Sequence, residues 1–497
     1  MKLIDSIARR FGYTKRPASG GWRRNLAFKA AENSRLTEDW PTRILSADSA
    51  VGTGLRTMRS RSRDLERNDS HARGFGKALV RNVLGSEGIA FQSKVVEANG
   101  TPDKLANLRI EEAWYRWGIN RFCDVERKLT WREMQTMALR RAAYDGEVLL
   151  RWVRETANPY GISLRLIEAD LLDETHNENL ENGGTIRMGV ERNSIGQVTA
   201  YHLLNGHPGD TMPAPKNGNR RERVPAELII HLFLPERPGQ SRGWPWLTAA
   251  IRDLGMLGGY KEAELVAARV SAAKAGFITK TFPDGMPYPE EEDGSGKTME
   301  VEPGIIEELP MGSQFTPWDP THPNTAFGDF VKSALRSVAT GMGVSYNTLS
   351  SDLEGVNYSS IRAGLLDERE EWLQIQSWLI DHLCRPVFRK WLEVCLLGGA
   401  IKLPPEKLEK FTADTWRGRR WQWVDPEKDV RAGLLAVEGG LKSRRQIVAE
   451  SGGDIEETLD EIAQDNQMAD EKGVTLSGPN GAQPVAKPAP EPNPPSQ

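Results

Sequence analysis

A polar segment, residues 344–363 (VSYNTLSSDLEGVNYSSIRA), lies between two stretches whose apolar residues recur with the period of an α-helix. The stretch before it, 327–342, carries one apolar face, formed by Phe330, Val331, Ala334, Leu335 and Val338. The stretch after it, 358–397, carries a stripe that we expect to be buried, formed by Trp372, Ile375, Leu379 and Leu383. A long polar connection held between two helices usually has a function. Because this one contains no catalytic grouping, we expect its function to be mechanical.

Length and charge set further limits. A chain of 497 residues is too long for one simple core, so several domains are expected. The formal net charge of −4 means that the chain is not a general polycation. Any contact with a nucleic acid must therefore come from local basic patches.

The cysteines and the apolar runs indicate the compartment. Cys123, Cys384 and Cys395 include no CxxC pair, which argues against a disulfide framework and against a structural zinc site. We therefore expect a reducing compartment such as the cytoplasm. The N-terminus, MKLIDSIARRF, lacks the apolar core of a signal peptide, and the run 228–234 is too short to cross a bilayer. No membrane association is predicted.

The first half of the chain predicts helices and then strands. A basic arm at the N-terminus precedes helical patterns over 47–84 and 103–146. The aromatic residues of the second pattern sit beside Leu and Met and are expected in the core: Trp114, Tyr115, Trp117 and Trp131. Within the strand region, 147–234, one strand is expected through Ile186, Met188 and Val190. A turn at 193–196 should connect it to a second strand over 198–204.

The second half predicts long helices around an acidic insertion. Residues 247–275 are rich in Ala, Leu and Glu, which favour a helix. Residues 277–325 are acidic and rich in Pro and Gly, and Pro386 should kink or break the helical region 358–397. Ser443 with Gln446 and Asp454 with Glu457 match capping boxes of two short helices. The Pro-rich end of the chain should be disordered.

Motifs of known chemistry are incomplete. Gly294–Thr298 (GSGKT) resembles the end of a phosphate-binding loop, but Glu291 stands where the motif needs its first Gly. The histidines show no metal-ligand spacing, and His202 and His231 are expected to be hydrogen-bonded structural residues. The acidic residues Asp367, Glu368, Glu370 and Glu371 are expected on a solvated helix face. The sequence therefore predicts no catalytic residue, no metal site and no cofactor.

Four tracts occur in an order that is similar to that of the lambda-type portal proteins of tailed phages. They are the Arg-rich region ending in RNVLG, then RPGQSRG, then GVSYNTLSSDLEGVNYSSIRA, and finally WVDPEKDVRAGLLAVEGGL with SGGDIEE. Together the resemblance covers residues 40–470. It implies a mainly helical α+β, multidomain portal fold with a wing, stem, clip and crown, assembled as a ring of twelve subunits around a central tunnel.

The resemblance also implies a division of the chain. The expected parts are a basic N-terminal arm (1–39), wing (40–246), first stem helix (247–275), clip (276–326), second stem helix (327–343), tunnel loop (344–357), long wing and tunnel helix (358–400), crown (401–472) and disordered tail (473–497). Family portals sit at one capsid vertex of the virion, admit and release double-stranded DNA, and dock the terminase large subunit and later the head–tail adaptor. The major capsid protein and the scaffold are further implied partners.

Two sets of residues are predicted to act. The tunnel loop would place polar and acidic side chains against passing DNA: Ser345, Tyr346, Asn347, Thr348, Ser350, Ser351, Asp352, Glu354 and Asn357. The clip would offer an acidic patch to the terminase and the adaptor: Glu290, Glu291, Glu292 and Asp293.

Other classes of protein remain as alternatives. One is a DNA-processing enzyme such as a nuclease or a packaging ATPase, which requires a carboxylate–metal cluster or an intact phosphate-binding loop. Another is a different head component, such as a coat protein or a head–tail adaptor. A coat protein has no need of two stem-like helices that flank an insertion.

Overall fold

The computed structural model describes residues 41–211, 221–272, 276–280, 313–317, 326–354, 357–421, 426–450 and 452–474. The chain divides into two units, Met1–Ser46 and Ala47–Gln497, and every helix and strand described here belongs to the second. The predicted basic arm lies outside the described residues, as does the predicted tail apart from its first two residues. As predicted, the fold is α+β and mainly helical.

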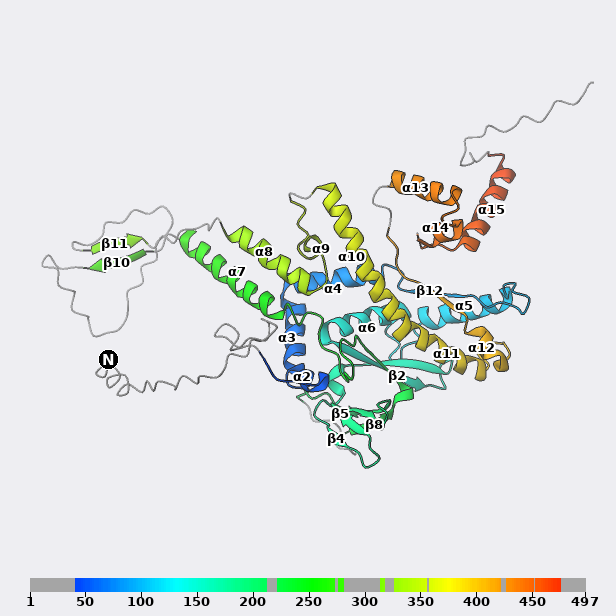
Figure 1. Cartoon of the computed structure of the whole chain (residues 1–497), viewed down its shortest axis with the longest axis horizontal. Helices are drawn as coiled ribbons and strands as arrows, with labels where there is room; N and C mark the ends of the chain where they lie inside the picture. Colours follow the sequence, from blue (N-terminus) through cyan, green and yellow to red (C-terminus); the bar gives the residue numbers. More distant parts are fainter. Residues whose placement is uncertain are drawn as a thin grey trace, which may run out of the picture. The chain divides into compact units, whose positions relative to one another are not determined.

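Five helices form the N-terminal part of the second unit: α2 (Ala47–Gly52), α3 (Leu55–Asn68), α4 (Ser70–Val83), α5 (Lys104–Ile119) and α6 (Trp131–Asp145) (Figure 1). Their boundaries follow from local chemistry. The Asp69 side chain accepts from the backbone N–H of Ala72 at 2.7 Å and begins α4. Thr130 and Glu133 form a reciprocal capping box at the start of α6. Gly146, with φ of 87°, ends α6 where a Cβ would lie 2.3 Å from the backbone of Trp244.

Two antiparallel sheets follow these helices. The three-stranded sheet has the order β3 (Ile162–Ile167), β2 (Glu147–Arg154), β9 (Ile229–Phe233). The five-stranded sheet runs in chain order through β4 (Glu178–Asn179), β5 (Thr185–Arg187), β6 (Val190–Arg192), β7 (Val198–Leu204) and β8 (Arg221–Pro225). A buried apolar cluster that includes Leu149, Tyr201 and Val224 joins the two sheets.

The predicted hairpin at 193–196 is confirmed, but the single strand predicted through Ile186 and Val190 is wrong. Those residues belong to two strands, β5 and β6, which pair with each other. Met188 and Gly189 lie between them with φ of 45° and 81°, so the chain reverses there. The apolar alternation continues across the turn because Ile186, Met188 and Val190 are all buried.

The main core contains a cluster of aromatic rings. The indole rings of Trp114, Trp117 and Trp131 are buried and pack against each other. Trp114 also meets Trp391 at 5.0 Å between ring centroids, which joins α5 to the C-terminal half of the unit. The prediction of a core position is wrong for Tyr115, which is 66% exposed. One residue along a helix is a rotation of about 100°, so the neighbour of a buried Trp114 turns outward.

The predicted interruption near Pro386 is present as a π-helical turn. Helix α10 (Tyr358–Leu379) continues through the π turn η4 (Ile380–Cys384) into α11 (Arg385–Leu397), with Pro386 in its first turn. The remaining elements are β1 (Ala90–Ser93), which pairs with β12 (Asp414–Arg417), and the helices α12 (Leu408–Phe411), α13 (Pro426–Glu438), α14 (Arg444–Glu450) and α15 (Ile455–Lys472). Ser443 and Gln446 cap α14 reciprocally, as predicted.

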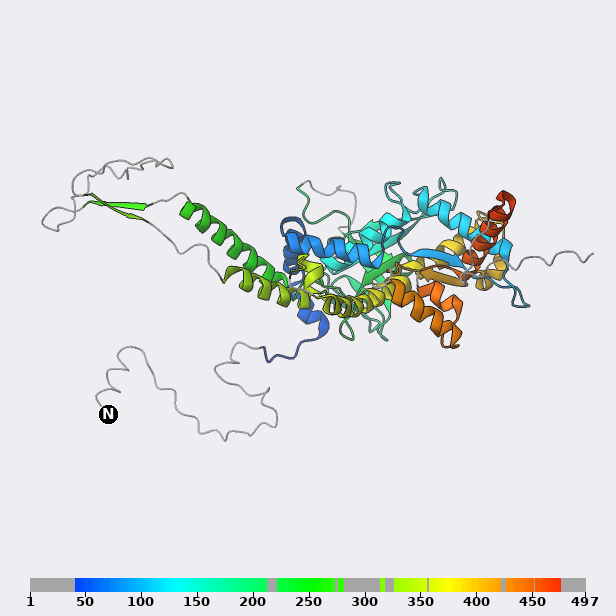
Figure 2. The same ribbon diagram turned by 90° about the horizontal axis from the view of Figure 1, so that it is seen from above.

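Helices α7 (Ile251–Ala272) and α8 (Phe327–Gly341) correspond to the two predicted helices over 247–275 and 327–343. They contact each other and run side by side in both views (Figures 1 and 2). Beyond α7, β10 (Gly276–Lys280) pairs antiparallel with β11 (Ser313–Pro317). The acidic residues 290–293 and the GSGKT stretch lie outside the described residues. Among the described helices, no segment has the length and apolar character needed to cross a membrane.

Candidate functional site

The segment predicted to be a polar loop contains a short helix. Gly343, with φ of 67°, turns the chain after α8, and α9 (Tyr346–Ser350) follows. Ser345 caps α9 by accepting from the backbone N–H of Thr348 at 3.1 Å. Ser351 ends α9 in the left-handed region, with φ of 56°. We call residues 344–357 the tunnel segment below, with residues 355 and 356 outside the described part.

A buried carboxylate holds the start of α9 against α10. Glu368 is 6% exposed, and its Oε2 accepts from the hydroxyl groups of Thr348 at 2.8 Å and Ser345 at 3.2 Å. The prediction of a solvated face is therefore wrong for Glu368, whereas Asp367, Glu370 and Glu371 are exposed. These contacts with Glu368 commit the hydroxyl groups of Ser345 and Thr348 to the interior of the chain.

The acidic residues of the tunnel segment are paired with α8. The Nζ of Lys332 lies 2.9 Å from Glu354 and 3.8 Å from Asp352. The Tyr346 hydroxyl donates to Asp352 at 2.8 Å. The backbone N–H of Glu354, then Tyr346 and Lys332, lower the pKa of Asp352. The segment therefore offers less net negative charge than its sequence suggests.

Helix α9 is also anchored to α4 and, through α4, to α7. Leu349 is buried, and α9 packs on both α4 and α8. The Nζ of Lys261 on α7 donates to the Nε2 of His71 on α4 at 3.0 Å. The His71 ring also forms a hydrogen bond with the backbone carbonyl of Leu349. Burial, and then Lys261, lower the pKa of His71, so its neutral ring can accept from the ammonium group.

The predicted tunnel residues thus fall into two groups. Five lie at or within α9 and are half-buried: Ser345, Tyr346, Asn347, Thr348 and Ser350. Ser351, Glu354 and Asn357 are exposed, and Asp352 is partly so. Leu353, which is 65% exposed, is an apolar neighbour that the sequence reasoning passed over. The exposed tip of the segment is therefore 351–354 and 357.

A second polar centre lies in the part of the chain that was predicted to form the wing. Glu147 on β2 is fully buried and accepts from Arg59 on α3 at 2.8 Å and from the Nε of Arg242 at 2.8 Å. His231 on β9 lies 2.9 Å from its other carboxylate oxygen. Arg242 also donates to the backbone carbonyl groups of Ala169, Leu172 and Met188. The RPGQSRG tract thus supplies a buried structural arginine.

The two histidines that were predicted to be structural are both hydrogen-bonded, which confirms that expectation. His202 lies 3.0 Å from Glu191, and Arg223 binds the same carboxylate with two N–H groups. The hydrogen bond from Arg223 is the largest cause that lowers the pKa of Glu191, to about 2.

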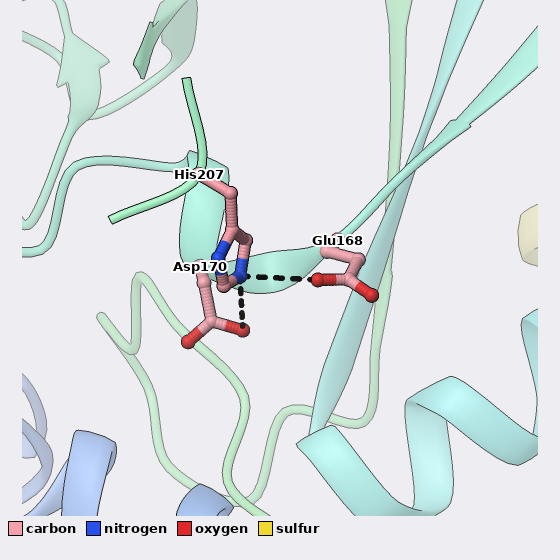
Figure 3. A group of neighbouring side chains, drawn as sticks. All are labelled: Glu168, Asp170 and His207. Carbon is pink, nitrogen blue, oxygen red and sulfur yellow. Dashed lines mark ion pairs between the residues drawn. The ribbon is translucent and has the colours of Figure 1, made fainter. Parts of the chain in front are cut away.

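One group of side chains has the composition of a metal site. Glu168, Asp170 and His207 converge in Figure 3, where the Nε2 of His207 lies 3.1 Å from Glu168 and 3.9 Å from Asp170. Asp170 is already bound by Arg59 at 3.2 Å and by Arg63 at 2.6 Å. Two guanidinium groups on one ligand would repel a cation, so this group fits an ion-pair network better than a metal centre.

Comparison with known proteins identifies the family. A family model described as the phage portal protein, lambda family, matches residues 33–376. The probable portal protein of Halomonas phage phiHAP-1 is 35% identical over 453 residues, which cover 90% of this chain and 87% of that protein. The chain belongs to the lambda family of phage portal proteins. The four tracts predicted this family correctly.

More distant portal proteins align over a similar share of the chain, at lower sequence identity. Portal protein B of Escherichia phage lambda is 22% identical to this portal protein over 459 residues, covering 84% of this chain and 85% of the relative. Among solved structures, the neck of an empty gene transfer agent (GTA) particle matches 79% of this chain and 93% of its own, with a TM-score of 0.42 and 13% identity. Portal proteins are structural proteins of the virion.

Proposed function

We propose that twelve copies of this chain form a ring at one capsid vertex, through which double-stranded DNA is packaged and later ejected. The observation that carries this proposal is the lambda-family match over residues 33–376, together with 35% identity to a portal protein across 90% of the chain. In this proposal the ring docks the terminase during packaging and the head–tail adaptor afterwards.

Helices α7 and α8 support the ring, because a single chain leaves much of their apolar surface uncovered. Met256, Leu265 and Val266 on α7 are 66%, 63% and 51% exposed, and Phe330 on α8 is 55% exposed. A Cβ added at Gly255, Gly258 or Gly259 would meet nothing within 4 Å. Small residues let another helix approach closely, and apolar patches of this kind mark interaction sites. In a closed ring, each neighbouring subunit covers this surface in turn.

The predicted division of the chain is retained in the proposal. Helices α7 and α8 are the stem, and the clip, 276–326, is the part of the chain that connects them. The wing comprises α2–α6 with the two sheets, α10 and α11 form the long wing and tunnel helix, and the helices after residue 401 are the crown. The tunnel segment joins stem to wing, and its exposed tip, 351–354, is the part proposed to face DNA.

Partner binding is assigned to the clip. Its acidic residues, 290–293, are proposed to contact the terminase large subunit and then the adaptor, while the major capsid protein and the scaffold contact the outside of the ring. No catalytic role is proposed, and ATP hydrolysis belongs to the terminase. Assembly is proposed to occur in the host cytoplasm before the ring enters the virion.

The test of the ring is a pair of variants on exposed helix surfaces. Gly258→Leu with Gly259→Leu adds bulk to the open face of α7 and should reduce the native mass from that of the ring to that of single subunits. Arg61→Leu with Arg73→Leu introduces the same two apolar side chains at exposed positions of α3 and α4, without adding bulk to α7, and should leave the ring intact. Rings of unchanged mass from the glycine variant would show that this face of α7 is not between subunits.

A further inference from the structure

A cavity of about 930 Å³ lies among α4, α6, the chain after β12 and Gly452. Its lining includes six basic residues: Lys77, Arg81, Arg140, Arg417, Arg419 and Arg420. The RNVLG tract of the family forms part of the same wall, since Arg81, Leu84 and Gly85 all line it. The tunnel segment and the Glu147 centre contribute none of its lining.

Four of these cations are not neutralised within the described part of the chain. Lys77, Arg81, Arg419 and Arg420 make no ion pair with any described acidic residue, whereas Arg140, which also lines the cavity, is paired with Glu66. Arg419 donates instead to the backbone carbonyl of Arg81. Glu87 is the one acidic residue among the described lining residues, and it too forms no ion pair there.

The cations also repel one another. Burial lowers the pKa of Arg419, and the nearby charge of Arg81 lowers it further. The charge of Arg419 in turn is a cause, after burial, that lowers the pKa of Arg369. A cluster of like charges is unfavourable in the free chain, and a bound polyanion relieves that repulsion.

We propose that this cavity binds the phosphate backbone of double-stranded DNA, as a site separate from the tunnel segment. Lys77 and Arg81 are four residues apart on α4, so both project from one face of that helix, and Arg420 lines the cavity from the chain after β12. The choice of DNA rests on the proposed function, because DNA is the polyanion that a portal ring handles.

The lining favours a nucleic acid over an acidic protein segment. None of the described residues that line the cavity is aromatic, and five are glycines: Gly76, Gly85, Gly88, Gly418 and Gly452. Protein interfaces usually rely on aromatic anchors in apolar pockets. Contacts to phosphates need cations and space for the DNA backbone, and they do not depend on the base sequence. Binding at this cavity is therefore independent of DNA sequence and sensitive to salt.

The experiment measures binding of a 30-base-pair DNA duplex to the full chain by fluorescence anisotropy at several salt concentrations. Lys77→Gln with Arg81→Gln removes two exposed charges from the cavity, and Arg61→Gln with Arg389→Gln removes two exposed charges elsewhere. Both variants keep the basic N-terminal arm, so the arm contributes equally. The slope of log K against log salt should fall in magnitude by about 1.8 for the cavity variant, at roughly 0.9 per phosphate contact. The control variant should keep the slope of the unmodified chain.

Ring mass, measured on the same samples, separates this inference from the proposed function. Intact rings with a reduced slope only in the cavity variant support the inference. Intact rings whose slope is the same in both variants overturn it and leave the portal proposal standing. Polyglutamate of matched charge serves as a second probe. If polyglutamate binding depends on Lys77 and Arg81 while DNA binding does not, the site takes an acidic polypeptide and the DNA assignment is wrong.

Discussion

The Nε of Arg242 lies 2.8 Å from a carboxylate oxygen of Glu147, and both side chains are fully buried. Arg242 belongs to the chain just before α7, whereas Glu147 begins β2 in the three-stranded sheet. The pair therefore fixes the chain just before α7 to the three-stranded sheet. Burial alone would raise the pKa of Glu147, but Arg242 and His231 lower it far below its usual range. The carboxylate is ionised at neutral pH.

Removing this charge should destabilise the part of the chain that holds the two sheets. Glu147→Gln leaves Arg242 buried without the charge of Glu147 and leaves Arg59 with Asp170 alone. Breaking a buried pair in this way costs about 3–5 kcal/mol. Urea unfolding followed by tryptophan fluorescence measures the loss, because the aromatic cluster lies in the same unit. Glu227→Gln, at an exposed position, is the matched control and should change stability little. Equal stability of the two variants would mean that the buried charges are not coupled as described.

The five-stranded sheet should lose stability in acid through Glu191. Hydrogen bonding from Arg223 lowers the folded-state pKa of Glu191 from 4.5 to about 2. Its contribution is therefore present above pH 4.5 and is lost as pH falls from 4.5 towards 2. Glu191→Gln should be less stable than the unmodified chain at pH 6, and the difference should shrink between pH 4.5 and pH 2.5. A difference that stays constant over that range would remove Glu191 as the titrating group.

The tip of the tunnel segment should control DNA passage through its charge. Asp352→Lys with Glu354→Lys adds positive charge at each subunit and should slow packaging in a salt-dependent way. The change also breaks the pairing with Lys332, so a local folding defect must be separated from a charge effect. Adding Lys332→Glu to the same chain allows the pairs to form again in reverse while the tip keeps its lysines.

Packaging efficiency and ring integrity are measured on both of these chains. The charge account expects slowed packaging in both, with intact rings. Full recovery of packaging in the triply substituted chain would show that the ion pairs with Lys332, and not the charge at the tip, are what packaging needs. Failed assembly with normal packaging by the few remaining rings would make the segment a subunit interface.

The clip acids should matter for partners and not for assembly. Replacing Glu290, Glu291, Glu292 and Asp293 with Lys should impair packaging while the ring mass stays unchanged, because a docking surface for the terminase is reversed in charge. Packaging assayed with purified terminase checks this. Normal packaging by the variant would take these acids out of the interface.

The pure chain should show no ATPase or nuclease activity. Glu291 interrupts the phosphate-binding motif, and the carboxylates at Glu168 and Asp170 lie against His207 and two arginines. Phosphate release from ATP, measured with and without Mg²⁺, should match the buffer blank. Metal-dependent turnover that disappears in Lys297→Ala would contradict this expectation.

Local patterns predicted the helices well because their signals lie close together in the sequence. Helices α7 and α8 followed from periodicity, and the cap at Ser443 followed from residues three positions apart. The tunnel segment was predicted as a loop because α9 depends on Glu368, which lies 20 or more residues after the hydroxyl groups it binds. A polar sequence gives no sign of such a distant partner.

The buried polar centre could not be assembled from the sequence for the same reason. Arg59 lies in an Arg-rich run, and Glu147, His231 and Arg242 come from three further segments. The available signal was a charged residue, Glu147, at the start of an apolar strand. The sequence of that strand does not show which residues pair with the charge. The basic cavity likewise needs β12 to bring Arg419 and Arg420 beside α4, and sheet pairing between residues more than 300 positions apart is a property of the fold.

Negative-stain electron microscopy of the purified full chain tests the central claim most directly. The portal account predicts a closed ring of identical subunits around a central hole. Each subunit contacts the next head to tail through the same rotation, and a ring forms when these rotations complete a full turn. Class averages should show a ring with a central opening and twelvefold symmetry. Particles without a central opening would contradict the account. So would single subunits that persist when the protein concentration is raised.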